Sequence, residues 1–369
     1  MTGSITSDWP AAAGERQGRP LIVTEDEALL DDLLRLCAAA GAVPEVAQAP
    51  PGRGGSWAAA PLVLVGDDCA ARMGGAVHRE GVVLVGSDPD DPGIWQRAVE
   101  IGARHVVVLP DGESWLVDRI ADAVEGAGRP ALTVGVIGGR GGAGASTLAC
   151  ALAVCAARAG HRTMLIDGDP LGGGLDVLLG GERAEGLRWP AFAGSRGRVA
   201  GRALEESLPE LHGLRLLSWD RGDCAAVPPE AMRAVLAAAR RRGGIVVVDL
   251  PRRLDGAAAE ALEQLDLGLL LVPSELRAVV AAHRIASVAG MMLGELRLVV
   301  RGPFGPGLDG GEVARLLGLP LAGELPLEPG LSQSLLAGRP PGGNEKGPLS
   351  RFGTEFWQQA LVEDGGVPV

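Results

Sequence analysis

Nine residues from Gly139 to Thr147 read GRGGAGAST and join two segments of opposite character. The segment before them, Leu132 to Ile137, is short, apolar and β-branched, whereas Thr147 to Arg158 after them is rich in alanine and leucine. A strand, a glycine loop and a helix in this order form an anion cradle, because loop N–H groups and the helix N-terminus both face the anion. A flexible glycine connector is the alternative in a chain with 57 glycines.

The loop lacks the residue that normally carries its charge. A phosphate-binding loop has glycine, four residues, a second glycine, lysine and then serine or threonine. Alanine takes the lysine position here, although we still expect the loop to bind nucleotide through Gly139, Gly141, Gly142, Ala143, Gly144, Ala145, Ser146 and Thr147. A charged hydrogen bond to phosphate contributes about 1.5 to 3 kcal/mol, so its loss should weaken binding about ten- to a hundredfold. Hydrolysis should suffer more, because charge stabilises the transferring phosphoryl group.

Three acidic residues follow two apolar strand segments. Asp167 and Asp169 come after Met164 to Ile166, and Asp249 comes after Ile245 to Val248. Open α/β sheets bind ligands at the carboxyl ends of their strands, so we expect these carboxylates beside the glycine loop. Ser146, Asp167 and Asp249 are the candidate Mg²⁺ site, with Ser146 supplying a hydroxyl. Caps or solvated turn residues are the alternative for each carboxylate.

The composition bounds the class of protein. The chain has 369 residues, of which 22% are charged and 47% hydrophobic, and this indicates a globular protein long enough for two domains. A net charge of -12 argues against a nucleic acid or an anionic membrane as the main partner. Five scattered cysteines, no signal peptide and no long apolar segment predict a reduced, cytoplasmic protein without a transmembrane segment.

The alternation of apolar strands and helical stretches predicts an α/β fold with two doubly wound parallel sheets. Residues 1–18 are expected to be a disordered leader, 19–125 a first unit, 126–130 a linker, 131–337 a second unit and 338–369 a tail. Strands of the first unit are predicted at 20–24, 61–65, 81–85 and 105–109, and those of the second at 132–137, 162–166, 214–217, 244–248, 267–272 and 296–300.

The tail contains one predicted helix, Leu349 to Leu361. Phe352, Phe356 and Trp357 fall on one side of it. We expect this side to pack onto the second unit, because a membrane-surface helix carries a basic polar face and this helix does not.

The ordered segments GGRGGAGAST, DGDPLGGGLDVLLG and VVVDLPR resemble the MinD/ParA class of P-loop ATPases, in particular the actinobacterial branch related to CpaE and called septum-site-determining proteins. The resemblance covers about residues 131–337 and implies ATP and Mg²⁺ as cofactors. In that class the loop has lysines at the positions of Arg140 and Ala145, and the first reaches across a homodimer to the partner's phosphates. The resemblance implies catalytic roles for Arg140 and Asp169, with Asp167 as the partner of Asp169 and Asp249 as the Walker B residue.

Residues 19–125 resemble the receiver-like domain of this branch. Phosphorylation of a receiver needs an acidic pair, an acceptor aspartate, a hydroxyl residue and a lysine. The first three roles can be filled by Glu25 and Asp26, by Asp67 or Asp68, and by Ser87, but Leu109 precedes Pro110 where the lysine belongs. We therefore expect a pseudo-receiver that binds a partner or sets location.

The resemblance implies a nucleotide-responsive positional regulator, a dimerising switch in septum placement or in assembly of a Tad-type pilus or secretion apparatus. Its partners would be division or secretion proteins that recruit it to the pole or septum. A slow true ATPase and a pseudo-ATPase scaffold are the alternatives. A DNA-binding role is disfavoured, because the basic runs at Arg240 to Arg242 and at Arg252 and Arg253 suit a helix C-terminus and a solvated loop.

Overall fold

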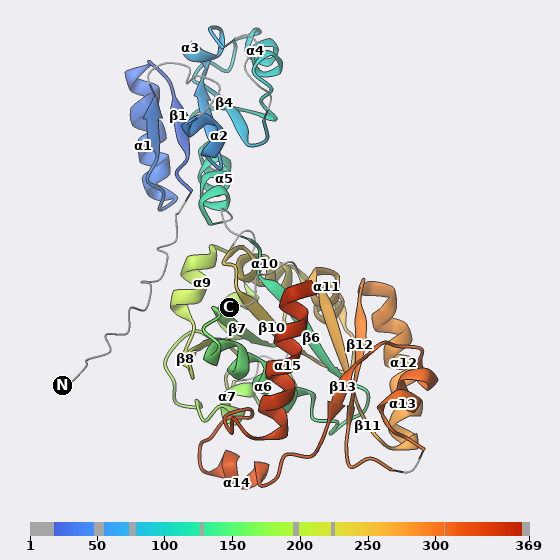
Figure 1. Ribbon diagram of the computed structural model, residues 1–369. Helices are drawn as coiled ribbons and strands as arrows, with labels where there is room; N and C mark the ends of the chain where they lie inside the picture. Colours follow the sequence, from blue (N-terminus) through green and yellow to red (C-terminus); the bar gives the residue numbers. More distant parts are fainter. Residues whose placement is uncertain are drawn as a thin grey trace, which may run out of the picture. The chain divides into compact units, whose positions relative to one another are not determined.

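The computed structural model describes residues 18–47, 55–73, 79–125, 129–194, 199–222, 226–305 and 307–363. The chain forms two compact units, Met1–Ala127 and Gly128–Val369, which Figure 1 draws in one view. Apart from residue 18, the expected leader lies outside the described residues, as do residues 126–128 of the expected linker.

The first unit is built on a five-stranded parallel sheet with the order β2-β1-β3-β4-β5. Its strands are β1 (Leu21–Val23), β2 (Glu45–Ala47), β3 (Val63–Gly66), β4 (Val82–Gly86) and β5 (His105–Val108). One face is covered by α1 (Glu27–Ala39) and α5 (Glu113–Glu125), and the other by α2 (Ser56–Ala59), α3 (Asp67–Ala70) and α4 (Ile94–Glu100). Helix α1 begins where the Asp26 carboxylate accepts hydrogen bonds from the N–H groups of Ala28 and Leu29.

The second unit contains an eight-stranded sheet with the order β13-β12-β11-β6-β10-β7-β9-β8. All neighbours run parallel except β8 and β9. The strands are β6 (Leu132–Gly138), β7 (Thr163–Asp167), β8 (Glu210–Leu211), β9 (Leu214–Leu217), β10 (Ile245–Leu250), β11 (Leu267–Pro273), β12 (Leu296–Arg301) and β13 (Leu321–Leu325). Strand β6 therefore lies inside the sheet, with β10 on one side and β11 on the other.

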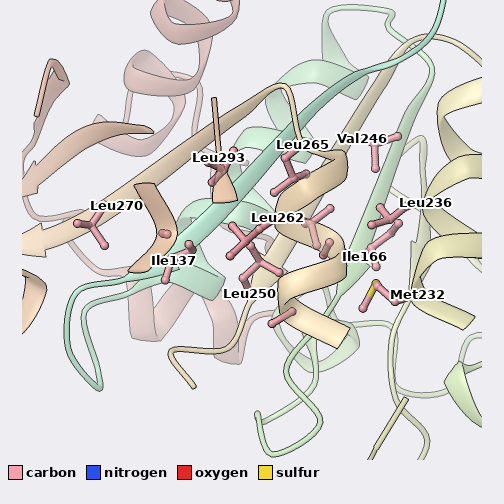
Figure 2. Close-up of a cluster of buried hydrophobic side chains, with 14 of the residues drawn as sticks. Ile137, Ile166, Met232, Leu236, Val246, Leu250, Leu262, Leu265, Leu270 and Leu293 are labelled. Carbon is pink, nitrogen blue, oxygen red and sulfur yellow. The ribbon is translucent and has the colours of Figure 1, made fainter. Parts of the chain in front are cut away.

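Helices cover both faces of this sheet and enclose two cores. They are α6 (Ala145–Arg158), α7 (Leu175–Leu178), α8 (Trp189–Ala193), α9 (Gly201–Ser207), α10 (Pro229–Arg241), α11 (Gly256–Gln264), α12 (Leu276–Met292), α13 (Gly310–Leu317), α14 (Leu331–Leu336) and α15 (Pro348–Glu363). Helices α8 to α13 bury apolar side chains on one face, part of which Figure 2 shows around Leu262 and Leu236. Helices α6 and α15 cover the opposite face, where Figure 1 shows α15 in red beside α6.

The predicted fold class, two α/β units with parallel sheets, is confirmed. Three strands were not expected from the sequence. Strand β2 has only three residues, two of them exposed, and β8 has two residues. Strand β13 reads LAGEL and is half exposed at the sheet edge, so it carries neither a continuous apolar run nor strict alternation.

The C-terminal helix packs onto the second unit, as expected. Phe352, Phe356 and Trp357 of α15 are buried with residues of α6 in one core. The Trp357 indole N–H also donates a hydrogen bond of 2.8 Å to the carbonyl of Leu152 in α6. Because α6 leaves the glycine loop, α15 supports the helix on which the candidate site is built.

Replacing Trp357 by alanine should therefore destabilise this unit. Loss of a buried tryptophan side chain typically lowers the free energy of unfolding by about 3 to 5 kcal/mol. Urea unfolding followed by circular dichroism measures the change. Leu336→Ala is a suitable control, because Leu336 is 90% exposed, and it should change stability by less than about 0.5 kcal/mol. Equal stability of the two variants would contradict the packing role of α15.

Candidate functional site

The glycine loop lies between β6 and α6, at the carboxyl edge of the sheet. The N–H of Gly139 donates to the carbonyl of Leu271 at 2.9 Å, which ties the start of the loop to β11. Gly144 ends the loop in a left-handed conformation with φ of 101°, a backbone that favours glycine. It is the N-cap of α6, and no side chain caps the helix there. The first N–H groups of α6 are therefore directed at the space before the helix, as anion binding requires.

The carboxylates predicted from the sequence come together on one side of this loop. Asp249 and Asp167 are neighbours in the register of β10 and β7, and both are buried. Asp249 is hydrogen-bonded to the hydroxyl of Ser146, the second residue of α6. Ser146, Asp167 and Asp249 line one pocket of about 240 Å³ together with Gly172 to Leu175, Val177 and Leu178. The strand ends and the loop thus converge as expected.

Burial changes the protonation of two of these groups. It raises the pKa of Asp249 to about 8, against the lowering effect of the Ser146 hydrogen bond, and the negative charges of Asp167 and Asp169 add to the rise. It also raises the pKa of Asp167 to about 6, although Asp167 accepts hydrogen bonds from the Ser218 hydroxyl and the Leu175 N–H. A cation in this pocket would favour both charged forms.

Asp169 lies at the start of the loop that follows β7. One of its carboxylate oxygens accepts a hydrogen bond of 3.1 Å from the N–H of Leu171, and its carbonyl accepts one from Gly172. These contacts stabilise a turn. The charge of Asp169 also acts on Asp167 and Asp249, so this residue belongs to the same acidic group.

Two tryptophans hold the backbone beneath the acidic group. The indole N–H groups of Trp189 and Trp219 both donate to the carbonyl of Asp167, at 2.6 and 3.1 Å. Their rings lie 6.0 Å apart between centroids. Sequence reasoning did not find this pair, since neither residue is near β7 along the chain.

The residues fit a phosphate with its metal ion better than they fit a metal ion alone. Within the described residues, no group of three or more His, Cys, Asp or Glu side chains could hold a metal. The Ser146 hydroxyl and the carboxylates of Asp249 and Asp167 would therefore share Mg²⁺ with water and phosphate oxygens. The pocket is also smaller than the roughly 300 to 1,000 Å³ of a small-molecule site, and two carboxylates line it, so it suits a hydrated cation beside a phosphate better than a whole nucleotide.

Positive charge gathers on the opposite side of the loop. Arg140 donates from Nη2 to Glu275 at 2.9 Å and from Nη1 to the carbonyl of Gly141 at 3.0 Å. The arginine that the resemblance directs toward a second subunit is therefore paired within its own chain. Arg301, at the end of β12, also lies against the loop, because a Cβ placed on Gly144 would be 2.9 Å from its Nη1. Sequence reasoning missed Arg301, whose only signal was its place at a strand end.

The candidate phosphorylation site of the first unit is occupied by internal contacts. Asp67 forms a bidentate pair with Arg97 at 2.6 and 2.8 Å. Asp68 accepts hydrogen bonds from the hydroxyl of Thr24 at 2.8 Å and the N–H of Glu25 at 2.7 Å. Leu109, at the position expected for lysine, is buried.

Two arginines of the basic run at Arg240 to Arg242 form ion pairs within their own chain, whereas Arg252 and Arg253 are exposed. Arg240 pairs with Asp266 at 3.1 Å and Arg242 with Glu205 at 2.8 Å.

Among the helices in the described part of the chain, none is both long and apolar enough to span a membrane.

The stability of the protein should depend on pH through Asp249. Its raised pKa means that the native state holds a proton at pH values where the unfolded chain has released it. The free energy of unfolding should therefore fall as pH rises from about 5 to 8.5, by up to about 1.4 kcal/mol per unit. Asp249→Asn should flatten the profile above about pH 6 in urea unfolding without Mg²⁺, while Asp167, whose pKa is raised to about 6, still contributes below that pH. Glu263→Gln, an exposed change on α11, should leave the profile unaltered, and parallel profiles for Asp249→Asn and wild type would contradict the assignment.

The first unit should not accept a phosphoryl group from acetyl phosphate. Both candidate acceptors are held by hydrogen bonds, and Leu109 offers no cation to an acyl phosphate. Intact-mass spectrometry should show no adduct. A stoichiometric adduct that disappears in Asp67→Asn or Asp68→Asn would identify a working receiver.

Family models match both units of the chain. Residues 23–131 match the Rv3660c-like, CheY-like N-terminal domain, and residues 134–293 match the CobQ/CobB/MinD/ParA nucleotide binding domain. The proteins Rv3660c and MT3760, from the H37Rv and CDC 1551 strains of Mycobacterium tuberculosis, are each 40% identical over 318 residues. These alignments cover 84% of this chain and 89% of each relative.

Solved structures share the fold of the second unit. A ParA family ATPase from Chlorobium tepidum matches with a TM-score of 0.57 and 17% identity over 63% of this chain and 99% of its own. The MinC:MinD cell division complex of Aquifex aeolicus matches with a TM-score of 0.55 and 21% identity over 65% of this chain and 98% of its own. The MinD protein of Pyrococcus horikoshii, complexed with Mg-ADP, matches with a TM-score of 0.52 and 16% identity over 64% of this chain and 98% of its own. The expected MinD/ParA class is thereby confirmed, and the chain belongs to the Rv3660c-like family, in which a CheY-like domain precedes a MinD/ParA-type nucleotide-binding domain.

Proposed function

We propose that this protein is a nucleotide-responsive positional regulator that binds ATP with Mg²⁺ and hydrolyses it slowly or not at all. The proposal rests on one observation: the loop has the geometry of an anion-binding site, although alanine stands where the lysine is expected. Gly144 keeps its left-handed cap, and Ser146 keeps its contact with Asp249, while Ala145 begins α6 between them. The backbone and the hydroxyl can still bind phosphate and its metal ion, whereas one cation of the usual set is absent.

In this proposal the nucleotide's phosphates lie against Gly139 to Thr147. Ser146, Asp249 and Asp167 would hold Mg²⁺, which would neutralise phosphate charge. A cation there would favour the carboxylate forms of Asp249 and Asp167 over their protonated forms. The MinD of Pyrococcus horikoshii in complex with Mg-ADP supports this choice of ligand.

Weak hydrolysis follows from three features. Ala145 gives no charge to the transferring phosphoryl group. Arg140 is paired with Glu275 in its own chain and would have to leave it to reach a second subunit. Asp169, the catalytic residue implied by the resemblance, stabilises its own turn. We propose that the active form is a homodimer in which Arg140 exchanges Glu275 for the partner's phosphates.

The cellular role in this proposal is the placement of a larger assembly. The likeness to the MinC:MinD cell division complex of Aquifex aeolicus supports a partner protein that recognises one nucleotide state. Division-site selection and assembly of a Tad-type pilus or secretion apparatus are the two candidate processes, with recruitment from the cytoplasm to a pole or septum. The first unit serves as a pseudo-receiver that binds a partner, since its acidic residues are already paired.

Millimolar ATP with Mg²⁺ should raise the melting temperature of the purified protein. A ligand present at a hundred times its Kd stabilises the native state by about 2.7 kcal/mol, which is a shift of several degrees for a unit of this size. Differential scanning fluorimetry measures the shift, with adenosine as the control that lacks phosphate. No shift with ATP, ADP or pyrophosphate would favour the pseudo-ATPase scaffold, and rapid phosphate release would favour a true ATPase.

The lysine can also be restored. Ala145→Lys should lower the Kd for ATP about tenfold or more, because it returns a charged hydrogen bond to an otherwise retained cradle. Asp169→Ala in that background should reduce any turnover and leave binding unchanged. An Ala145→Lys protein that folds and binds no better than wild type would mean that the cradle is not shaped for phosphate.

A further inference from the structure

We propose that Arg301 supplies the phosphate-binding cation that the loop lacks at Ala145. The proposal rests on the nucleotide-binding function given above and assigns the positive charge of that site to a residue of β12. Arg301 is the last residue of β12, and its backbone carbonyl accepts a hydrogen bond from the N–H of Ser274 at 2.9 Å. It therefore lies at the same carboxyl edge of the sheet as the glycine loop.

The side chain of Arg301 extends from β12 to the end of the loop. Its Nη1 would be 2.9 Å, and its Cδ 3.9 Å, from a Cβ placed on Gly144. Gly144 directly precedes Ala145, so the guanidinium is next to the position where the usual lysine begins. A side chain at residue 144 would meet this guanidinium, and glycine leaves room for it.

Within the described parts of the chain, the guanidinium of Arg301 forms no direct ion pair. Among the described residues its side chain makes no hydrogen bond or ion pair, and its Nε is buried without a partner. Arginines elsewhere on β12 and α13 differ, since Arg297 pairs with Glu295 and Glu363, and Arg315 pairs with Glu312. A partly buried cation without a partner is costly, so its position calls for an anion.

The surroundings of Arg301 make the loop electropositive on this side. Burial lowers the pKa of Arg301 from its ordinary value, and the positive charge of Arg140 lowers it further, while Glu275 opposes the shift. Glu275 is already paired with Arg140. Two guanidinium groups thus share one carboxylate beside a loop whose N–H groups also attract negative charge.

The chemistry of the side chain suits phosphate. A guanidinium offers several N–H donors in one plane and binds phosphate oxygens through two parallel hydrogen bonds. The acidic group of Asp167, Asp169 and Asp249 lies beside the opposite flank of β6, where the metal ion is proposed. Phosphate between the two flanks would meet a metal ion on one and Arg301 on the other.

Isothermal titration of the full-length protein tests this assignment. Arg301→Gln, which keeps most of the side chain's length and removes its charge, should weaken binding of ATP with Mg²⁺ about ten- to a hundredfold. Pyrophosphate with Mg²⁺ should lose affinity to the same extent, because it contains the phosphates without base or ribose. Arg301→Lys should retain more affinity than Arg301→Gln. Arg297→Ala, which removes a paired arginine from the same strand, is the control and should bind like wild type.

The decisive variant combines two changes. Ala145→Lys placed in the Arg301→Gln protein should recover most of the lost affinity, which a merely structural role of Arg301 would not predict. Unchanged binding by Arg301→Gln would overturn the proposal while leaving nucleotide binding intact. Weaker binding of ATP with unchanged binding of pyrophosphate would overturn it as well, because Arg301 would then contact the base or ribose. A wild-type protein that binds neither probe would refute the proposed function itself.

Discussion

The parallel pairing of β6 with β10 on one side and β11 on the other is the constraint on which the candidate site depends. It places the carboxyl ends of five strands at one edge of the sheet, and it separates the charged residues that follow them into two groups, one on each side of the glycine loop. Strands β10 and β7 bring Asp249 and Asp167 to one flank of the glycine loop, whereas β11 and β12 bring Glu275 and Arg301 to the other. A slip of one residue in any of these strands would turn the charged side chain to the other face of the sheet.

The buried polar groups of the candidate site lower the free energy of unfolding. Asp249 and Asp167 are buried without a basic partner among the described residues, and the N–H groups that begin α6 have no side-chain cap. Groups of this kind oppose folding unless a ligand compensates them. The two apolar cores on either face of the sheet, including the contact of α15 with α6, offset this cost. Such a distribution is expected where a fold preserves a binding site.

The sequence predicts the parts of the protein that are local or strongly patterned. The β-branched run before Gly139 and the acidic ends of β7 and β10 predict both the sheet and the acidic group, because periodicity and strand-end position depend on few residues. Arg301 could not be found in this way, since it is more than a hundred and fifty residues from Gly144 and its contact requires the order of β12, β11 and β6. The pairing of Arg140 with Glu275 depends on the same tertiary arrangement.

The short strand β13 escaped prediction for a different reason. Its Gly323 and Glu324 weaken the strand pattern, and only pairing with β12 makes it part of the sheet. Arg240 also shows how tertiary contacts decide between interpretations. The sequence places it in a basic run, and in the structure its side chain forms an ion pair with Asp266.

The paired indoles of Trp189 and Trp219 give the acidic group an internal optical reporter. Both rings donate to the carbonyl of Asp167, so a shift of the backbone at the end of β7 alters the polarity around two fluorophores at once. Both side chains are buried, which keeps solvent from masking their emission. Events at the carboxyl edge of the sheet can therefore change the emission of two of the seven tryptophans in the chain.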